Sequence, residues 1–288
     1  MAAYQKILIT GAYGFIGSYI HVAVPTGSSA ITLGLNAAND VICDLSKDIP
    51  YIAEHPECVI HSAAPGRNPK EGLAMVRNLC TALHDMPPAA FVFISSVQVY
   101  GLTEGSKIDE SAPLRPQTVY GRTKLAAEEY LTSWCSAHNV CLTIIRAVSV
   151  IGRGMNGNPA MMDKAISKGR FLMPHGCTGR RSFIHAADLA KMAIASAGHP
   201  GTFNATDCRD HTASALALAI AEHRGVKPPH IINKTIFRTV KALSKLVPSL
   251  RNKVKSLTLD LTFDGTRIVK ATNITPGNAL EMLKSDPL

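Results

Sequence analysis

The hydrophobic positions in the first half of the chain fall into short, β-branched runs separated by stretches with helical spacing. Each run is bounded by glycine, proline or polar residues, as buried parallel strands commonly are. The five runs are residues 6–10, 29–35, 58–64, 90–96 and 141–147. The clearest helical stretches between them are 73–83 and 121–138. Strands that alternate with helices predict right-handed βαβ units and a doubly wound parallel sheet of the α/β class.

The second half of the chain is less regular. Beyond about residue 150 the pattern loosens into glycine- and proline-rich connections around two helical stretches, 185–196 and 212–224. We find no internal repeat in the sequence. This part of the chain is where we expect a substrate-binding lobe.

A glycine-rich turn follows the first predicted strand. The stretch TGAYGFIG places Gly11, Gly14 and Gly17 three residues apart, before the apolar SYIHVAV. In a strand-to-helix turn, glycines let the backbone approach a pyrophosphate, and the helix N-terminus offers N–H groups to the anion. Three glycines alone fit a plain tight turn equally well, but their place after the first strand favours dinucleotide binding. Downstream, Asp44 supplies a loop carboxylate, for which a solvated surface acid is the alternative.

Tyr120 and Lys124 stand four residues apart where the helical stretch 121–138 begins. This spacing puts both side chains on one face of a helix. Taken alone, the pair is more often an ordinary surface pair than an acid–base couple. Its interpretation therefore depends on the rest of the sequence.

Six motifs in order resemble those of the extended short-chain dehydrogenase/reductase family, in its branch of NAD-dependent nucleotide-sugar epimerases and dehydratases. They are GAYGFIG at 11–17, DL at 44–45, HSAA at 61–64, SSVQVYG at 95–101, YGRTK at 120–124 and RRSFIHAADLA at 180–190. The resemblance covers about residues 6–207 and is loose beyond them. It implies a Rossmann-type NAD(P)-binding domain over residues 1–150, to which 183–207 returns, and a smaller C-terminal substrate-binding lobe over 151–288.

The resemblance implies that Tyr120 is the acid–base residue, which exchanges a proton with a sugar hydroxyl or ketone. A free tyrosine has a pKa of about 10, so the phenolate needs nearby positive charge. Lys124 and the oxidised nicotinamide would supply it, and Lys124 would also hold the nicotinamide ribose. Ser96 is expected to hydrogen-bond the reacting oxygen, with a strand-end serine that caps the backbone as the alternative. We therefore expect the catalytic triad Ser96, Tyr120 and Lys124, and a structural role for Ser95.

The expected cofactor-binding residues follow the same motifs. They are Gly11, Tyr13, Gly14, Phe15, Ile16, Gly17, Asn36, Asp44, Leu45, Ala63, Ala64, Asn78, Tyr120 and Lys124. By resemblance, Asp44 and Leu45 would flank the adenine. Ala63 and Ala64 would line the nicotinamide side. Asn78 resembles a helix asparagine that supports the lysine through the backbone, and a helix-surface amide is the alternative.

The resemblance also assigns residues to the substrate. Arg181 resembles an arginine that grips the substrate diphosphate, a task suited to a planar and permanently charged guanidinium. Ser149 stands three residues after Arg146, where many relatives have an asparagine, so the pocket has one amide fewer. Ser96 would also contact the substrate.

The expected reaction is 4-epimerisation of a nucleotide sugar. Sugar 4,6-dehydratases typically carry an acidic pair where this chain has Val97 and Gln98, which argues against dehydration. A nucleotide-4-keto-sugar reductase would use the same triad and stays open as an alternative. A non-catalytic nucleotide-binding subunit is a further alternative, although both Tyr120 and Lys124 are present.

Cofactor choice, metal content and location follow from smaller signals. Asn36 lies after the second predicted strand, and no Lys or Arg occurs from Ser18 to Ser46, which favours NAD without excluding NADP. The seven cysteines contain no C-x-x-C pair, so we expect neither a metal site nor disulfides.

No apolar run in the sequence reaches about 18 residues, the length that would span a membrane. We therefore expect a soluble cytoplasmic protein, and the resemblance adds a homodimer formed by two paired helices.

The formal net charge of +9 is concentrated in one segment. Residues 224–255 contain nine Lys and Arg and no acid, so the remainder is neutral and we expect no nucleic-acid binding. Within 234–255, apolar residues recur at helical spacing beside Lys234, Arg238, Lys241 and Lys245. A lobe helix with solvated lysines is the first interpretation. The second is an interfacial helix that holds the enzyme against an anionic membrane.

Overall fold

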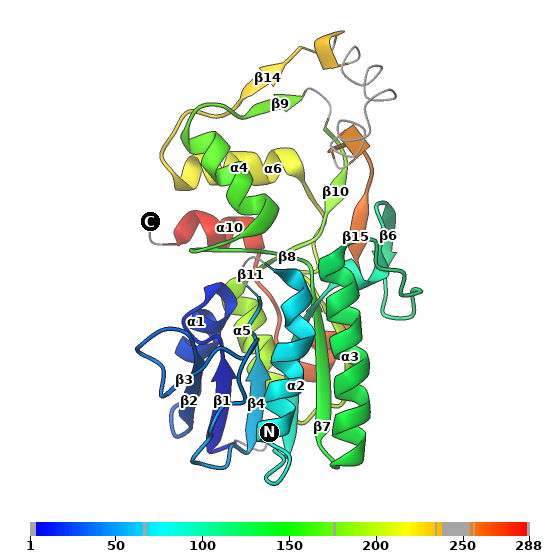
Figure 1. Cartoon of the computed structure of the whole chain (residues 1–288). Helices are drawn as coiled ribbons and strands as arrows, with labels where there is room; N and C mark the ends of the chain where they lie inside the picture. Colours follow the sequence, from blue (N-terminus) through cyan, green and yellow to red (C-terminus); the bar gives the residue numbers. More distant parts are fainter. Residues whose placement is uncertain are drawn as a thin grey trace.

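The computed structural model describes residues 4–65, 68–174, 177–233, 235–237, 254–255 and 257–286. Its centre is a seven-stranded parallel sheet in the order β12-β7-β5-β4-β1-β2-β3 (Figure 1). The strands are β1 (Lys6–Thr10), β2 (Ser29–Gly34), β3 (Val41–Ile42), β4 (Cys58–His61), β5 (Ala90–Ser96), β7 (Cys141–Ala147) and β12 (Gly201–Ala205). The predicted doubly wound sheet is confirmed. The strand order reverses beside β1, and ligands of such sheets bind at that switch point.

The five predicted strands are all present, and the sequence missed the two edge strands. β3 has two residues and β12 begins with a glycine, so neither produces a hydrophobic run that periodicity detects. Each edge strand is stabilised by pairing with its neighbour in the sheet. Val41 of β3 aligns with Leu33 of β2, and Phe203 of β12 aligns with Ile145 of β7.

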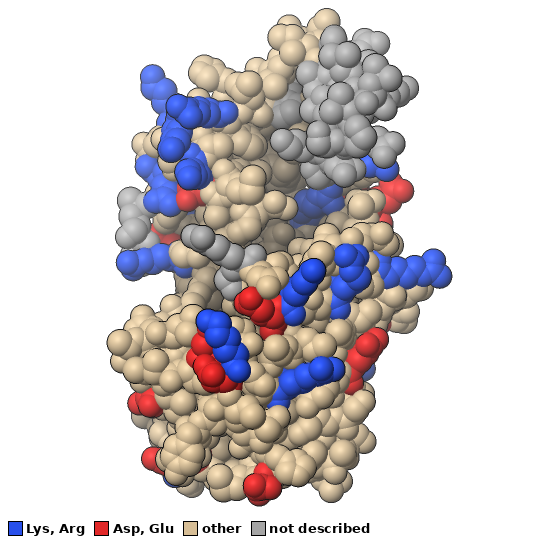
Figure 2. All heavy atoms as spheres, in the orientation of Figure 1, with Lys and Arg blue, Asp and Glu red and all other residues tan. Residues whose placement is uncertain are grey.

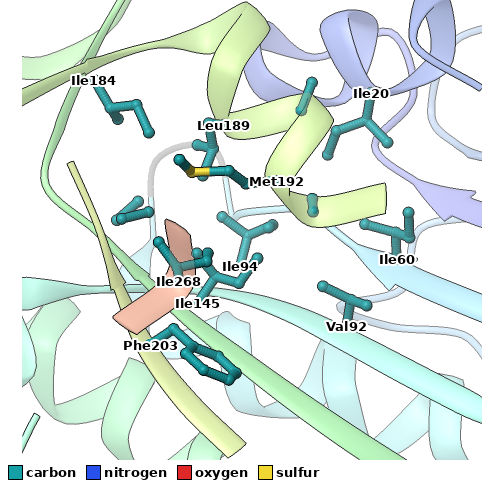
Figure 3. Packing of buried hydrophobic residues seen from close by; sticks show 14 of the residues in the cluster. Ile20, Ile60, Val92, Ile94, Ile145, Ile184, Leu189, Met192, Phe203 and Ile268 are labelled. Carbon is teal, nitrogen blue, oxygen red and sulfur yellow. The ribbon is translucent and has the colours of Figure 1, made fainter. Parts of the chain in front are cut away.

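Helices cover both faces of the sheet. On one face α2 (Gly72–Ala82) packs against α3 (Val119–Ala137). On the other face lie α1 (Phe15–Val22), α5 (Ala186–Ala195) and α9 (Thr266–Thr272). Figure 3 shows the second interface, where Ile20 of α1 and Met192 of α5 meet strand residues such as Ile60 and Ile145. A fully buried side chain of this kind contributes about 1.5–3 kcal/mol, so the strands that end at the site have a rigid base.

The boundary between sheet domain and lobe is more interleaved than the sequence suggests. Residues 183–207 include α5 and β12, which both join the sheet domain. α9 falls within the expected lobe, 151–288, yet Ile268 is buried in the core on the sheet (Figure 3). The chain thus returns to the sheet a second time, after the lobe.

The lobe has its own hydrophobic core. Its helices are α4 (Gly157–Ser167), α6 (Ala213–His223) and α10 (Ala279–Ser285), which bury Ile166, Leu216, Ile220, Leu280 and Leu283 together. The remaining strands are β6 (Gly105–Ile108), β8 (Ser149–Ile151), β9 (Leu172–Pro174), β10 (Arg180–Arg181), β11 (Phe183–His185), β13 (His211–Thr212), β14 (His230–Ile232) and β15 (Leu261–Phe263). Two short 3-10 helices, η1 (Pro69–Glu71) and η2 (Val97–Tyr100), precede α2 and follow β5. Figure 1 places β9 and β14 at the end of the molecule farthest from the large sheet.

Most of the basic segment 234–255 lies outside the described residues, including Lys234, Arg238, Lys241 and Lys245. Of its predicted apolar face, Ile236 is 55% exposed and Phe237 is 8% exposed. Within the part of the chain that the structure describes, no helix is long and apolar enough to cross a membrane.

Candidate active site

The turn between β1 and α1 forms a cradle at the switch point of the sheet. Gly14 donates its N–H to the Gly11 carbonyl at 2.8 Å and precedes the first residue of α1, with no side chain capping the helix. A Cβ atom at Gly17 would overlap the carbonyl oxygen of Gly11, so the helix can pack this closely on the turn only with glycine there. The uncapped helix N-terminus suits an anion such as a pyrophosphate. The cradle therefore fits a dinucleotide.

The loop after β2 is ordered by its own amides. Tyr13 donates its phenol hydrogen to the Ala38 carbonyl at 3.0 Å, which ties the glycine turn to this loop. The Asn36 side-chain oxygen accepts the Ala38 N–H at 2.9 Å, and the Asn39 amide donates to the Asn36 carbonyl at 2.7 Å. Asp40 accepts the Thr32 N–H at 2.8 Å. The loop thus presents amide groups where a nucleotide-binding sheet usually holds the adenosine ribose.

Asp44 and Asn78 have protein partners that the sequence did not reveal. The Asp44 carboxylate accepts the Ser46 hydroxyl at 2.7 Å and pairs with Lys47 at 2.9 Å. These hydrogen bonds, with Ser46 first, lower the pKa of Asp44 to about 2. Asn78 donates its amide to the carbonyl of buried Leu45 at 2.9 Å, so it ties α2 to this loop. The sequence did not predict this contact, because residue 45 is distant in sequence and only the fold brings it near.

A buried histidine supports the nicotinamide side. Thr10 accepts the Ala63 N–H at 3.2 Å, which leaves its own hydrogen for His61 Nδ1 at 2.8 Å. His61 stacks on Phe93 with ring centroids 5.7 Å apart. Burial, and then the charge of Lys124, lower the pKa of His61 to about 3, so the ring is neutral. The sequence motif HSAA contains this histidine, but only the fold assigns its partners.

The N-terminus of α3 is held tightly against η2. Thr118 caps the helix by accepting the Gly121 N–H at 2.9 Å, and it donates its hydrogen to the Gln98 side chain at 2.9 Å. A Cβ atom at Gly121 would lie 2.6 Å from the Gln98 carbonyl oxygen, closer than real side chains come. Glycine at this position therefore lets α3 approach the end of β5, and this approach brings Tyr120 to Ser96.

The Tyr120 hydroxyl and the Ser96 side chain are neighbours in the site. Burial raises the pKa of Tyr120, and the hydrogen bond with the Ser96 side chain opposes this rise. Ser96 also accepts the Gln98 N–H at 3.3 Å and so caps η2. The Ser96 hydroxyl therefore caps η2 and also lies beside the Tyr120 phenol.

Lys124 lies one turn further along α3 with its charge inside the protein. The residue is 8% exposed, its Nζ donates to the Ile94 carbonyl at 2.8 Å, and the Nζ lies 5.9 Å from the centre of the Tyr120 ring. Burial lowers the pKa of Lys124 to about 8, and the charge of Glu128 opposes the decrease. One cavity is lined by Ala63, Tyr120 and Lys124 together with His61, Pro65, Pro69, Gly72, Phe93, Thr123 and Ala127.

Behind this pair lies a buried polar network that the sequence did not single out. Glu128 pairs with Arg146 at 2.7 Å and accepts the Ser95 hydroxyl, which confirms the structural role of Ser95. Arg146 also donates to the Tyr100 hydroxyl at 3.1 Å, and Tyr100 donates to Asn204 at 2.8 Å. Glu128 lies four residues after Lys124, just as Lys124 lies four residues after Tyr120. This spacing was the sequence signal that could have identified Glu128.

The expected substrate residues lie on two small sheets beyond the end of the large one. Ser149 begins β8 and is exposed, and its register partner in β11 is Phe183. Arg181 in β10 is two residues from Phe183, and burial lowers its pKa while Asp260 opposes the decrease. Figure 2 shows the surface hollowed between the lobe and the sheet domain, with Lys and Arg side chains around the hollow. No group of three His, Cys, Asp or Glu residues able to hold a metal occurs among the described residues.

The profile of the NAD dependent epimerase/dehydratase family matches residues 7–206. Because this match covers more than half of the chain, the protein belongs to that family. The family is consistent with the glycine cradle, the Tyr120–Lys124 pair and the parallel sheet described above.

Similar proteins include several 4-epimerases. The N-acetyl-alpha-D-glucosaminyl-diphospho-ditrans,octacis-undecaprenol 4-epimerase of Escherichia coli O157:H7 is 29% identical over 160 residues, which are 53% of this chain and 48% of that protein. The UDP-glucose 4-epimerase of Vibrio cholerae is 26% identical over 230 residues, or 69% of each chain. A crystal structure of UDP-galactose 4-epimerase superimposes with a TM-score of 0.75 over 98% of both chains at 18% identity, which shows a shared fold.

Proposed function

We propose that this protein is an NAD-dependent nucleotide-sugar 4-epimerase. The observation that carries the proposal is the arrangement of Tyr120, which neighbours Ser96, lines one cavity together with Lys124 and lies one helical turn before this buried cation. This arrangement stands at the edge of a cradle that fits a dinucleotide. Membership of the NAD dependent epimerase/dehydratase family supports the same reaction class.

The sheet domain would bind the cofactor. The turn from Gly11 to Gly17, with Tyr13, Phe15 and Ile16, would hold the pyrophosphate at the N-terminus of α1. Asn36 would take the adenosine ribose, and Asp44 and Leu45 the adenine. Ala63 and Ala64 would line the nicotinamide. Asn78 would contribute indirectly, because it holds the Leu45 carbonyl and so the loop at the adenine. When bound, NAD would supply the hydride acceptor for oxidation of the sugar carbon and, once reduced, the hydride donor for its reduction from the opposite face.

The chain's own residues would move the proton. As a phenolate, Tyr120 takes the proton from the sugar hydroxyl when the carbon is oxidised, and returns it when the ketone is reduced. Ser96 hydrogen-bonds the same sugar oxygen and keeps it beside the phenol. Because burial raises the pKa of Tyr120, the phenolate depends on the positive charge of Lys124 and of the oxidised nicotinamide.

The lobe would bind the rest of the substrate. It would comprise residues 151–288 without α5, β12 and α9, which pack on the sheet domain. Arg181 would grip the diphosphate with its planar guanidinium. Ser149 would offer one hydroxyl where relatives offer an amide. The hollow between lobe and sheet domain would place the sugar over Tyr120.

The reaction is tested by mixing the purified protein with a panel of UDP- and dTDP-sugars and their 4-keto derivatives, while both absorbance at the reduced-cofactor band and product identity are followed. An epimerase gives a C4-inverted sugar without net cofactor oxidation or reduction. Stoichiometric oxidation of NAD(P)H with a keto-sugar would establish the reductase alternative instead. Tight NAD binding without turnover of any sugar would favour the non-catalytic subunit.

We further propose a cytoplasmic homodimer that can bind reversibly to an anionic membrane. The dimer contact would be the outer side of α2 and α3, which pack side by side on one face of the sheet. Membrane contact would use the basic segment 234–255. The Escherichia coli relative is named for a sugar diphosphate carried on undecaprenol, and a lipid-linked sugar of that kind is a second substrate class for the panel.

A further inference from the structure

We infer that Glu128 is a positioning residue that keeps Lys124 charged, and that Arg146 in turn fixes the orientation of the Glu128 carboxylate. The inference rests on the proposed function, because it assigns these two residues a task toward the acid–base pair. It adds two residues to the three expected catalytic ones. Together with Lys124 they form a buried row of alternating charge, here named the relay: the cation Lys124, the carboxylate Glu128 and the cation Arg146.

Lys124 needs such a partner because its other contacts are neutral. Its Nζ donates to one backbone carbonyl, of Ile94, and lies 4.6 Å from the centre of the Phe93 ring. A carbonyl and an aromatic face compensate only part of the cost of burying an ammonium group. Even with the charge of Glu128 opposing the decrease, burial lowers the pKa of Lys124 to about 8. Without Glu128, the lysine would lose its charge at a still lower pH.

Glu128 is held in place by hydrogen bonds to its carboxylate oxygens. It is 3% exposed and follows Lys124 by one turn of α3, so the two side chains share the buried face of the helix. Its two oxygens accept the Arg146 Nη2 at 2.7 Å and Nε at 3.2 Å, and also the hydroxyl of Ser95. Charge-assisted hydrogen bonds of this kind fix the carboxylate in one orientation. Its negative charge opposes the effect of burial on Lys124.

Other groups near Lys124 cannot replace Glu128. His61 on β4 is neutral at ordinary pH because burial lowers its pKa to about 3. Tyr120 on α3 has a pKa raised by burial and is neutral until the reaction ionises it. η1 and α2 contribute only Pro69 and Gly72 to the cavity at Lys124. Among the described groups that act on Lys124, Glu128 is therefore the source of negative charge.

Arg146 fixes the carboxylate in place. It is 5% exposed on β7, and its remaining nitrogen donates to Tyr100, which is bound in turn to Asn204 on β12. This anchors the relay to three elements, β7, η2 and β12, as well as to α3. Loss of Glu128 would leave two buried cations that repel each other, and Lys124 would then release its proton more readily.

The test compares three variants: Glu128→Gln, Arg146→Gln, and Glu129→Gln as a matched control at the exposed neighbouring position of α3. The first readout is the pH dependence of kcat/KM for epimerisation. Glu128→Gln should move the alkaline limb to lower pH by about one unit. Arg146→Gln should move the limb to lower pH by less than Glu128→Gln does, because the carboxylate remains but is no longer fixed in orientation. Glu129→Gln should match the unaltered protein.

The second readout does not depend on the reaction. Lysine labelled with ¹³C at Cε reports the protonation of Lys124 by NMR in the cofactor-free protein, with Lys124→Met to assign the signal. Glu128→Gln should lower the observed midpoint by the same amount as in kinetics. An altered midpoint without epimerase activity in any form would sink the proposed function and leave the relay standing. An unchanged midpoint in Glu128→Gln would overturn the relay itself.

A merely structural ion pair predicts a different result, namely similar losses of thermal stability in Glu128→Gln and Arg146→Gln and no shift of the lysine midpoint in either. If Glu128→Gln does not fold, the double variant with Arg146→Gln replaces it, because no unpaired charge then remains. Its lysine midpoint should still fall, since the carboxylate is gone, and Glu128→Asp should retain the native midpoint. A native midpoint in the double variant would contradict the inference.

Discussion

At the scale of single residues, burial sets the protonation of the groups around the candidate active site. It makes His61 a neutral support, raises the pKa of Tyr120 and lowers that of Lys124. The tyrosine is therefore neutral at rest, whereas the reaction needs the phenolate. The phenolate depends on positive charges placed nearby. The residues that determine the chemistry include Glu128 and Arg146, which do not line the cavity.

Replacing Tyr120 by Phe removes the proton carrier and little else. We expect turnover to fall by at least a factor of about 10²–10⁴, the contribution typical of a general acid–base group, while NAD affinity remains nearly intact. Lys124→Met should damage both, because Lys124 is also expected to hold the nicotinamide ribose. Steady-state kinetics and calorimetric titration with NAD measure the two effects. Near-native turnover in Tyr120→Phe would refute the assigned mechanism.

The alkaline side of the pH profile should report Lys124. Its pKa in the folded protein is lowered from 10.5 to about 8, so the charged form dominates below that pH and is lost above it. Activity should therefore decline as pH rises through about 8, and kcat/KM measured from pH 6 to 10 checks this. A rate that stays constant up to pH 10 would mean that the lysine charge is either retained or not needed.

At the scale of elements, two close contacts bring the site together. α1 lies against the glycine turn because Gly17 has no side chain, and α3 lies against η2 because Gly121 has none. These contacts join the ends of β1 and β5 to the helices that carry the binding and acid–base groups. The geometry of Tyr120 relative to Ser96 is therefore a property of the α3–η2 contact.

Gly121→Ala should disturb that contact specifically. The added Cβ would lie 2.6 Å from the Gln98 carbonyl oxygen, so the start of α3 must move away from η2. We expect turnover to fall by about 10²-fold, as small misplacements of reacting groups commonly cause, with a smaller loss of NAD affinity. Ser136→Ala, at an exposed position of the same helix, is the control. Equal turnover in the two variants would show that the contact does not position Tyr120.

The loop after β2 should discriminate between cofactors. Its polar groups are amides and a carboxylate that is bound to Thr32, and the segment from Ser18 to Ser46 has no Lys or Arg to receive a 2′-phosphate. We expect NAD to bind at least about tenfold more tightly than NADP. Fluorescence titration with both cofactors measures the ratio. Tighter binding of NADP would require a cation from another part of the chain.

At the scale of the whole molecule, acidic and basic side chains are distributed unevenly between the sheet domain and the lobe. The acidic side chains visible in Figure 2 lie mostly over the sheet domain. By contrast, the sequence has no acid from residue 223 to residue 259. At the far end of the lobe, Leu172 and Ile231 of the paired strands β9 and β14 are 58% and 63% exposed. Ile231 comes shortly before the basic segment in the sequence, and exposed apolar residues together with basic residues are typical of peripheral membrane proteins.

Membrane binding should depend on salt and on the basic segment. Each basic residue near an anionic surface contributes about 1 kcal/mol, so four suffice for reversible attachment. The protein should sediment with phosphatidylserine-containing liposomes at low salt. Addition of salt, or the change of Lys241 and Lys245 to Glu, should release it. No sedimentation at low salt would leave these lysines as ordinary solvated residues.

The sequence by itself determined the class of fold, because this depends on local spacing, and its motifs supplied the expected roles of Tyr120 and Lys124. Strand and helix periods specify the alternating βαβ order, and a four-residue interval places Tyr120 and Lys124 on one helix face. The tertiary structure alone decided how these residues behave. Contacts between distant segments bring Thr10 to His61, Asn78 to Leu45 and Arg146 to Glu128. Burial then sets the pKa values, and burial is a property of the packed chain that no local pattern contains.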